Sequence, residues 1–317
     1  MTINSLTAIV FPGQGSQSVG MLNELIPFYP SIKNIFDQAS QVLNYDLWKI
    51  VSQGPAQQLD QTAITQPALL AASYALWQLA TQSKSALQPS YLAGHSLGEY
   101  TALVCAEALT FEDAIKLVAA RGEYMQAAVL PGVGLMAAII GLDDDVVLNL
   151  CTETEAQTNE IVTPANYNST GQVVVAGHRG AVEQAMTLAK AAGAKLVIAL
   201  PVSVPSHCPL MQEAANRLEE LLQQITFNQP TIPVINNVDV KPYQNANDIR
   251  DGLVRQLYCP VRWVETVKWM RQHGVTTFIE CGPGKVLTSL IKRIDKSLQL
   301  INLSDFKTLK QMRGANE

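Results

Sequence analysis

Short runs of apolar residues, most of them leading into glycine or proline, alternate along the chain with longer stretches in which apolar residues recur every three or four positions. The short runs predict buried strands, and the longer stretches predict helices. The strand candidates are residues 8–11, 90–93, 234–237 and 277–280. The helix candidates lie in 21–83, with breaks expected at Gly54-Pro55 and near Pro67, and in 99–109, 210–224 and 248–272. Strands that alternate with helices predict the α/β class.

Residues 134–200 follow a pattern of their own. Strand candidates at 134–140, 161–166, 172–176 and 195–200 are interleaved with helix candidates at 143–151 and 180–192. The resulting order, β-α-β-β-α-β, is that of the ferredoxin-like motif. We therefore predict that residues 133–200 form an inserted subdomain and that residues 1–132 and 201–317 form one large α/β domain. The alternative is that these elements continue the main sheet.

Composition narrows the class of protein. The chain has 317 residues, of which 48% are hydrophobic and 15% charged, so it can bury a sizeable core. A net charge of −5 without a long basic run argues against a nucleic-acid partner. No uninterrupted apolar stretch approaches the roughly 18 residues of a membrane span, and the first seven residues do not resemble a signal peptide.

The cysteines and histidines point to a protein of the cytoplasm without a metal site. The five cysteines are an odd number without paired spacing, so we expect reduced thiols. The four histidines occur in no metal-binding motif, which argues against a protein-built zinc site.

The segment Gly94-His95-Ser96-Leu97-Gly98 stands between a strand candidate and a helix candidate. A serine on such a turn projects its oxygen into a cleft, and small residues two positions to either side let the backbone bend. The N-terminus of the following helix favours negative charge. We therefore predict that Ser96 is a nucleophile and that the N–H of Leu97 is an oxyanion donor. A serine that merely caps the helix is the alternative.

A second glycine-rich loop, residues 13–17, follows the first strand candidate. It is not a dinucleotide fingerprint, because Ser18 stands where the third glycine is needed, and it is not a P-loop, because Met21 replaces the lysine after Gly20. Two interpretations stay open from spacing alone. The loop presents the N–H of Gln14 as a second oxyanion donor, or it only connects a strand to a helix.

A serine nucleophile needs a base, and His207 lies in a proline-punctuated loop before a helix, where its side chain can reach a cleft. His95 adjoins Ser96 and is expected to point away from it, whereas His178 and His273 are expected at the surface or at element ends. An ordinary loop histidine is the alternative interpretation of His207. No aspartate stands out as a third member, so a backbone carbonyl could orient the base in a Ser-His dyad.

Arg121 lies on the apolar stripe of a helix that Thr110 is expected to cap. The stripe consists of Phe111, Ala114, Val118, Met125 and Ala128, and the helical neighbours of Arg121 are Leu117, Val118, Tyr124 and Met125. A buried guanidinium without a carboxylate costs on the order of several kcal/mol, so it needs a partner elsewhere. Its planar fork suits the carboxylate of a ligand. A structural ion pair with a distant acid is the alternative.

Five segments together carry a family resemblance: Phe11-Pro12-Gly13-Gln14-Gly15-Ser16-Gln17, Gly94-His95-Ser96-Leu97-Gly98-Glu99, Arg121-Gly122, Ser203-x-x-x-His207 and Gly282-Pro283-Gly284. In this order they resemble the malonyl-coenzyme A:acyl carrier protein transacylases of type II fatty acid synthesis, over about residues 6 to 310. The resemblance implies a large α/β-hydrolase-like domain with a ferredoxin-like insertion. Cys281 departs from the small apolar residue that is more usual there, and no catalytic effect is expected.

The resemblance also implies an activity, which is transfer of malonyl from coenzyme A to the phosphopantetheine thiol of acyl carrier protein through a malonyl-serine ester. It implies these roles: Ser96 as nucleophile, His207 as base, the N–H groups of Gln14 and Leu97 as oxyanion donors, Arg121 as ligand of the malonyl carboxylate, and the backbone carbonyl of Gln256 as the group that orients the base. It implies no cofactor, no metal and a monomer.

Acyl carrier proteins are acidic, so docking on this net negative chain requires a local basic surface. Basic residues gather near the C-terminus at Lys285, Lys292, Arg293, Lys296, Lys307, Lys310 and Arg313. An ordinary solvated face is the alternative. Two rival functions remain at this stage: a serine thioesterase or esterase, and a non-catalytic module that binds carrier protein on the same fold.

Overall fold

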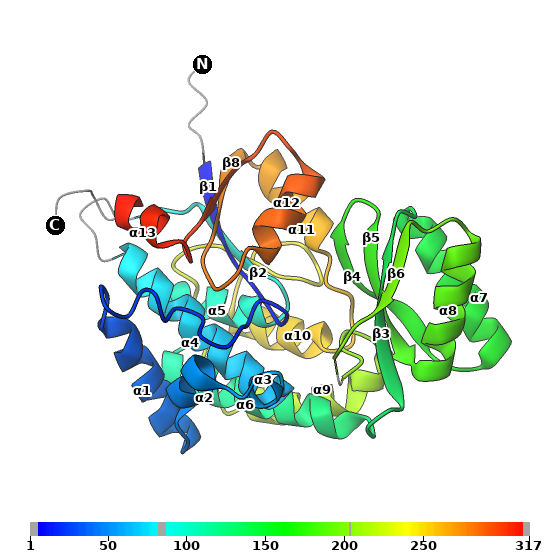
Figure 1. Ribbon diagram of the computed structural model, residues 1–317, viewed down its shortest axis with the longest axis horizontal. Coiled ribbons are helices and arrows are strands. Elements are labelled where there is room, and N and C mark those ends of the chain that lie inside the picture. Colours follow the sequence, from blue (N-terminus) through cyan, green and yellow to red (C-terminus); the bar gives the residue numbers. More distant parts are fainter. Residues whose placement is uncertain (1–5, 82–86, 203, 313–317) are drawn as a thin grey trace.

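The computed structural model describes residues 6–81, 87–202 and 204–312, and within them a parallel five-stranded sheet carries the larger part of the molecule (Figure 1). Its strand order is β7-β2-β1-β8-β9, and all four pairings are parallel. The strands are β1 (Leu6–Phe11), β2 (Tyr91–Gly94), β7 (Val234–Ile235), β8 (Val275–Glu280) and β9 (Gln299–Asn302). The four predicted strands are confirmed, because strands buried on both faces are continuous apolar runs. Strand β9 lies at the edge and was not predicted.

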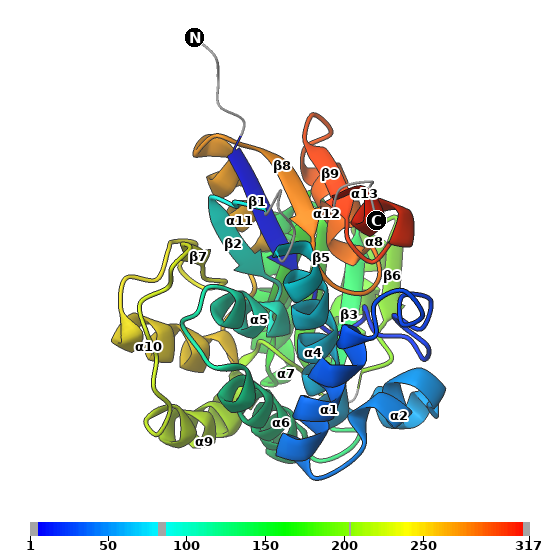
Figure 2. The ribbon, with the colours of Figure 1, turned by 90° about the vertical axis from the view of Figure 1, so that its left-hand side faces the viewer.

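Helices cover both faces of this sheet. Alternate residues of β1 point to opposite sides, so that Ile9 and Phe11 pack into one core cluster while Ala8 and Val10 pack into another. The first cluster is formed with α1 (Ser31–Leu43), α2 (Leu47–Gln53), α3 (Ala56–Leu59), α4 (Thr62–Thr81), α5 (Leu97–Cys105), α6 (Phe111–Ala128), α9 (Gln212–Leu222) and α10 (Ala246–Gln256). The second is formed with α11 (Trp263–Gln272) and α12 (Val286–Ile294). Figure 2 shows α1, α4, α5 and α6 stacked on one side of β1 and β2.

The predicted helices differ from the structure in three places. The break expected near Pro67 is absent, because α4 runs through this proline. A proline inside a helix costs about 3 kcal/mol, and the burial of Ala68 to Ala72 in the core outweighs that cost. The single helical stretch expected at 248–272 is two helices, α10 and α11, because Pro260 cannot continue the first. Residues 21–28 are turns rather than helix.

A smaller unit is built on a second sheet, whose order among the described residues is β4-β5-β3-β6 with every pairing antiparallel. Its elements are β3 (Gly134–Ile140), α7 (Asp144–Thr158), β4 (Val162–Ser169), β5 (Gln172–His178), α8 (Arg179–Ala191) and β6 (Leu196–Ala199). The predicted order of strands and helices is confirmed, although α7 extends well beyond residue 151. These strands do not continue the main sheet, and they enclose a core of their own with α7 and α8.

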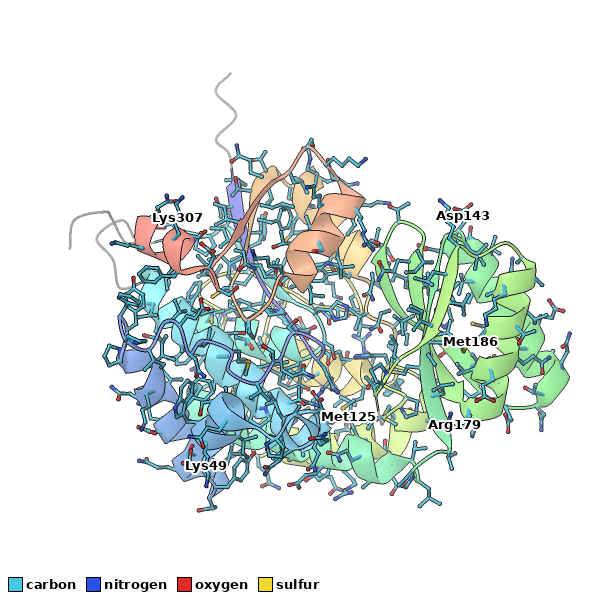
Figure 3. All side chains as sticks on the ribbon, viewed as in Figure 1. Lys49, Met125, Asp143, Arg179, Met186 and Lys307 are labelled. Carbon is cyan, nitrogen blue, oxygen red and sulfur yellow. The ribbon has the colours of Figure 1, made fainter. Side chains whose placement is uncertain are left out.

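The face of the small sheet that α7 and α8 leave uncovered packs against the large unit. Met136 and Val174 contact Cys208 and Leu210 there, and Tyr167 donates its N–H to the carbonyl of Val261 at 2.9 Å. In Figure 3, Met125 of α6 lies inside the molecule where the two units approach each other. The loops that follow β1 and β2 leave the carboxyl edge of the large sheet, where ligands bind in open α/β folds.

The remaining elements are a single turn of 3-10 helix (Pro209–Met211) before α9 and the C-terminal helix α13 (Phe306–Met312). In the part of the chain that the structure describes, no helix combines the length and apolar character needed to cross a membrane.

Candidate active site

Ser96 occupies a strained turn between β2 and α5. Its φ of 50° and ψ of −105° lie outside the conformations that a residue with a side chain usually adopts. The turn is packed so closely that a Cβ on Gly94 would lie 1.8 Å from the carbonyl carbon of Gly98, and a Cβ on Gly98 would lie 2.0 Å from the carbonyl oxygen of Phe11. The Asn237 side chain holds the turn by accepting from the N–H of Ser96 at 2.7 Å and donating to the carbonyl of Gly94 at 2.6 Å.

His207 reaches Ser96 from the loop that returns from the small unit. Its Nε2 lies 2.8 Å from Oγ of Ser96, and its Nδ1 lies 2.7 Å from the backbone carbonyl oxygen of Gln256. A carbonyl oxygen only accepts, so Nδ1 carries the proton and Nε2 accepts the hydroxyl proton of Ser96. Burial and the positive charge of Arg121 lower the pKa of His207 to about 3, which keeps the imidazole neutral. The arrangement suits a general base oriented by a carbonyl.

Arg121 brings a buried positive charge to the same place without a direct carboxylate partner among the described residues. Its side chain is almost completely buried, with Nη1 donating to Oε1 of Gln66 at 2.8 Å and Nη2 donating to Oε1 of Gln256 at 2.9 Å. Nη2 also donates to Oγ of Ser96 at 3.1 Å, and the Tyr100 ring centroid lies 5.3 Å from the guanidinium carbon. Among the described residues no carboxylate lies within ion-pair distance of the guanidinium. A structural ion pair is therefore not the reason for this arginine.

Gln14 and Leu97 line the same pocket as Ser96. The loop that carries Gln14 lies against the turn, because a Cβ on Gly13 would be 2.4 Å from the carbonyl oxygen of His95. Leu97 is the first residue of α5, where backbone N–H groups have no partner in the helix. In residues 6–81, 87–202 and 204–312, neither the N–H of Gln14 nor that of Leu97 donates to a protein acceptor. Both donors are available to a ligand at Ser96.

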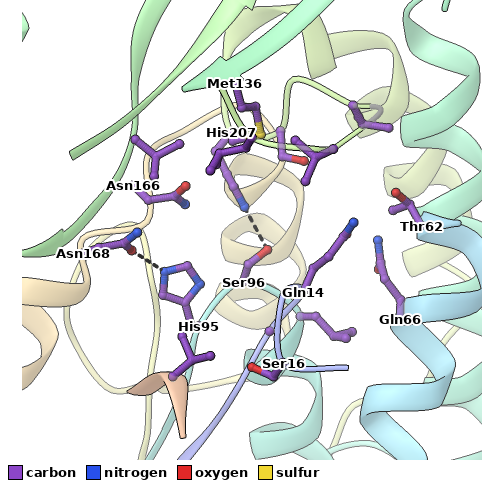
Figure 4. A pocket seen from close by; sticks show the side chains of 18 of the residues that line it. Gln14, Ser16, Thr62, Gln66, His95, Ser96, Met136, Asn166, Asn168 and His207 are labelled. Atoms are coloured by element: carbon purple, nitrogen blue, oxygen red, sulfur yellow. Dashed lines mark hydrogen bonds between the residues drawn. The ribbon is translucent and has the colours of Figure 1, made fainter. Parts of the chain in front are cut away.

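Both units form walls of this pocket (Figure 4). An apolar part is lined by Met125, Met136, Val174, Leu200, Val202 and Val204. Asn166 and Asn168 of β4 contribute polar groups, and Val286, Leu287 and Leu290 of α12 line another side. A pocket with an apolar lining and a few convergent polar groups is suited to binding a small organic group.

The His95 side chain lines the pocket and bonds to the small unit. Its Nε2 lies 2.8 Å from Oδ1 of Asn168 (Figure 4), and among the described residues its ring makes no hydrogen bond to Ser96, so the expectation that it points away from Ser96 is not contradicted. The contact with Asn168 arises because β4 of the small unit brings this residue over the large unit, which no local pattern reveals.

Gln66, Asn237 and Asn168 were not identified from the sequence as parts of the site, because each acts through a contact with a distant segment. Two residues that entered the sequence arguments, Ser203 and Arg313, lie outside the described residues. Among the described residues, no group of three or more His, Cys, Asp or Glu side chains could hold a metal ion.

Comparison with known proteins places this geometry in a family. A family model described as the acyl transferase domain matches residues 8–312 of the chain. A malonyl CoA-acyl carrier protein transacylase of Haemophilus influenzae is 55% identical over 298 residues, which are 94% of this chain and 95% of the relative. The chain belongs to the malonyl CoA-acyl carrier protein transacylase family. The predicted family is thereby confirmed.

Solved structures of the transacylase family have the same fold. The malonyl CoA-acyl carrier protein transacylase of Coxiella burnetii is 49% identical, with a TM-score of 0.94 and coverage of 97% of this chain and 96% of the other. A malonyl-transacylase in complex with its type II PKS acyl-carrier protein is 51% identical, with a TM-score of 0.94 and coverage of 98% of this chain and 100% of the other.

Proposed function

We propose that the chain transfers malonyl from coenzyme A to the phosphopantetheine thiol of an acyl carrier protein through a malonyl ester on Ser96. The observation that carries the proposal is the guanidinium of Arg121, buried without a carboxylate and 3.1 Å from the hydroxyl that His207 activates. Family membership supports it, and so does the relative whose structure was solved together with an acyl-carrier protein.

The first half-reaction acylates Ser96. His207 Nε2 takes the hydroxyl proton as Oγ attacks the thioester carbonyl of malonyl-coenzyme A. The N–H groups of Gln14 and Leu97 donate to the oxyanion that forms, and such donors contribute about 10²–10³ each to the rate in acyl-transfer sites. The carbon–sulfur bond then breaks, and the proton on His207 passes to the departing thiolate.

The second half-reaction reverses these roles. The phosphopantetheine thiol gives its proton to His207 and attacks the ester carbonyl. The ester bond breaks, Ser96 regains its proton from His207, and malonyl leaves on the carrier protein. The two half-reactions share one acyl-enzyme, so the kinetics are ping-pong.

Arg121 selects the acyl group in this scheme. The free carboxyl carbon of a malonyl ester lies only three bonds from Oγ of Ser96, which places the carboxylate beside the guanidinium. A carboxylate there supplies the direct ion pair that the guanidinium lacks among the described residues. Acetyl lacks that carboxylate.

We also propose finer descriptions of the fold. Ser96 at a strand-to-helix turn on the carboxyl edge of a parallel sheet supports an α/β-hydrolase-like domain, residues 1–132 and 201–317. The antiparallel order β4-β5-β3-β6 with α7 and α8 on one face supports a ferredoxin-like insertion, residues 133–200. The five free cysteines support a cytoplasmic location. The monomeric state and the lack of a cofactor stay predictions.

Incubation with radiolabelled malonyl-coenzyme A tests the function. We expect label on the wild-type protein, discharge of that label to added holo acyl carrier protein, and no label on Ser96→Ala. A hydrolase would instead release free malonate, and a non-catalytic module would stay unlabelled; either result would refute the proposal.

A further inference from the structure

Glu99 is a buried carboxylate that the proposed transfer does not use. It lies in α5, three residues after Ser96, and its side chain is inaccessible to solvent. One carboxylate oxygen accepts from the hydroxyl of Tyr243. The other accepts from the N–H of Asn237 at 2.9 Å and from Nε2 of Gln256 at 3.0 Å. Asn237 bonds the backbone of Ser96, and Gln256 bonds Arg121 and His207, so Glu99 contacts the site through these two residues.

One branch of this network leads to the nucleophile. Glu99 accepts from the backbone N–H of Asn237, and the Asn237 side chain bonds the backbone of Ser96 and Gly94. This branch fixes the turn that presents Oγ. It makes no contact with Arg121.

The other branch leads to the guanidinium and the base. The Gln256 amide nitrogen donates both to Glu99 and to the carbonyl of Ser96, the latter at 3.1 Å. The amide oxygen is thereby turned toward Nη2 of Arg121, from which it accepts a hydrogen bond at 2.9 Å. The backbone carbonyl of the same residue accepts from Nδ1 of His207.

The orientation of the Gln256 amide decides where the Arg121 fork points. Reversal of the amide would set its two N–H donors against the N–H donors of Arg121 and its oxygen against the carbonyl of Ser96. Glu99 opposes that reversal because it offers only acceptors to the amide nitrogen. We propose that Glu99 is a positioning residue for acyl selection, which holds the Gln256 amide so that Arg121 is aimed at the carboxylate of the acyl group. This inference rests on the proposed role of Arg121.

The geometry requires a hydrogen-bond acceptor at Glu99 and does not require its charge. Burial raises the pKa of Glu99 to about 7, so the protonated form is also populated near neutral pH. A protonated carboxyl, or a glutamine at this position, can still accept from Asn237 and Gln256 while donating to the oxygen of Tyr243. Glu99→Gln therefore preserves the arrangement, and Glu99→Ala removes it.

The experiment measures kcat/KM for malonyl-coenzyme A and for acetyl-coenzyme A in the same variants. In Glu99→Ala we expect the malonyl value to fall at least ~10-fold more than the acetyl value, since small displacements of a binding group cost on that order. Glu99→Gln should restore the wild-type ratio of the two values. Asn237→Ala is the matched control: it cuts only the branch to Ser96, so both values should fall together. Glu99→Asp, which withdraws the carboxylate by one methylene, gives the same readout if Glu99→Ala does not fold.

Equal losses for both substrates in the folded Glu99→Ala or Glu99→Asp protein would overturn the inference, and so would a Glu99→Gln enzyme as unselective as Glu99→Ala. The Arg121→Ala variant shows whether only the role of Glu99 is wrong or whether the proposed role of Arg121 is wrong as well. If Arg121→Ala shifts the ratio while Glu99→Ala does not, only the role of Glu99 is lost. If Arg121→Ala leaves the ratio unchanged, selection by Arg121 itself is wrong.

Discussion

Nη2 of Arg121 donates a hydrogen bond to Oγ of Ser96 over 3.1 Å, although the two residues come from different elements, α6 and the turn before α5. The positive charge therefore lies next to the atom that we propose to form the acyl bond. In the proposed scheme the free carboxylate of an acyl group is recognised at the place where the group becomes attached, so selectivity is joined to the chemical step.

Removal of this guanidinium should convert the enzyme from a malonyl-selective to an unselective transferase. In Arg121→Ala we expect kcat/KM for malonyl-coenzyme A to fall roughly 10–100-fold, because hydrogen bonds to charged groups are worth about 1.5–3 kcal/mol. Acetyl transfer should change much less. Arg121→Lys keeps the charge without the planar fork and should be intermediate. Equal losses for both substrates would remove the selectivity role.

The acylation of Ser96 should not lose rate through protonation of its base as the pH falls from 8 to 5. The pKa of His207 is lowered to about 3, so the neutral imidazole that accepts the proton prevails throughout this range. Single-turnover acylation, followed by quenched flow, measures this directly. Glu99 has a pKa raised to about 7, so the profile should be repeated in Glu99→Gln, where that titration is absent. A decline with a midpoint near the ordinary histidine pKa of ~6.5 in both enzymes would contradict the prediction.

Charge reversal on α12 should weaken the interaction with carrier protein. Val286 and Leu290 of this helix line the pocket, and Lys292 lies exposed further along it. We expect Lys292→Glu to raise KM for acyl carrier protein, and more so at low salt, while the first half-reaction is unchanged. Arg293→Glu should act in the same direction, although Arg293 also donates to Gln172.

Lys116→Glu is the control for this experiment. It introduces the same charge change on α6, which covers the other face of the large sheet. An unchanged KM in Lys292→Glu, or an equal rise in Lys116→Glu, would speak against the surface on α12.

The close packing behind the serine turn predicts a large loss of stability when a single methyl group is added at Gly98. A Cβ on Gly98 would lie 2.0 Å from the carbonyl oxygen of Phe11, a backbone atom that cannot move aside. Gly98→Ala should lower the free energy of unfolding by about 3 kcal/mol or more and reduce acylation. Gly132→Ala, at a positive φ with open space around it, should cost only about 1 kcal/mol. Urea unfolding compares the two, and a similar small loss in both would contradict the packing argument.

The sequence predicted those parts of the molecule that local pattern controls. Buried parallel strands are continuous apolar runs, and the turn around Ser96 requires glycines at fixed positions, so both could be recognised. Arg121 could be singled out because a charge on an apolar stripe is costly. Its neutral partners Gln66 and Gln256 could not be predicted as such, since they lie 55 and 135 residues away along the chain. The hydrogen bond between His95 and Asn168 could likewise not be predicted, because Asn168 belongs to the small unit.

The proposed nucleophile, base and orienting carbonyl come from remote segments: Ser96 and His207 are separated by 111 positions, and His207 and Gln256 by a further 49. A chain emerging from the ribosome thus carries its serine long before anything can deprotonate it. Reactivity appears only once synthesis has passed α10 and the small unit has folded back. Appearance of the acyl-enzyme during translation would therefore report that the segments carrying Ser96, His207 and Gln256 have come together.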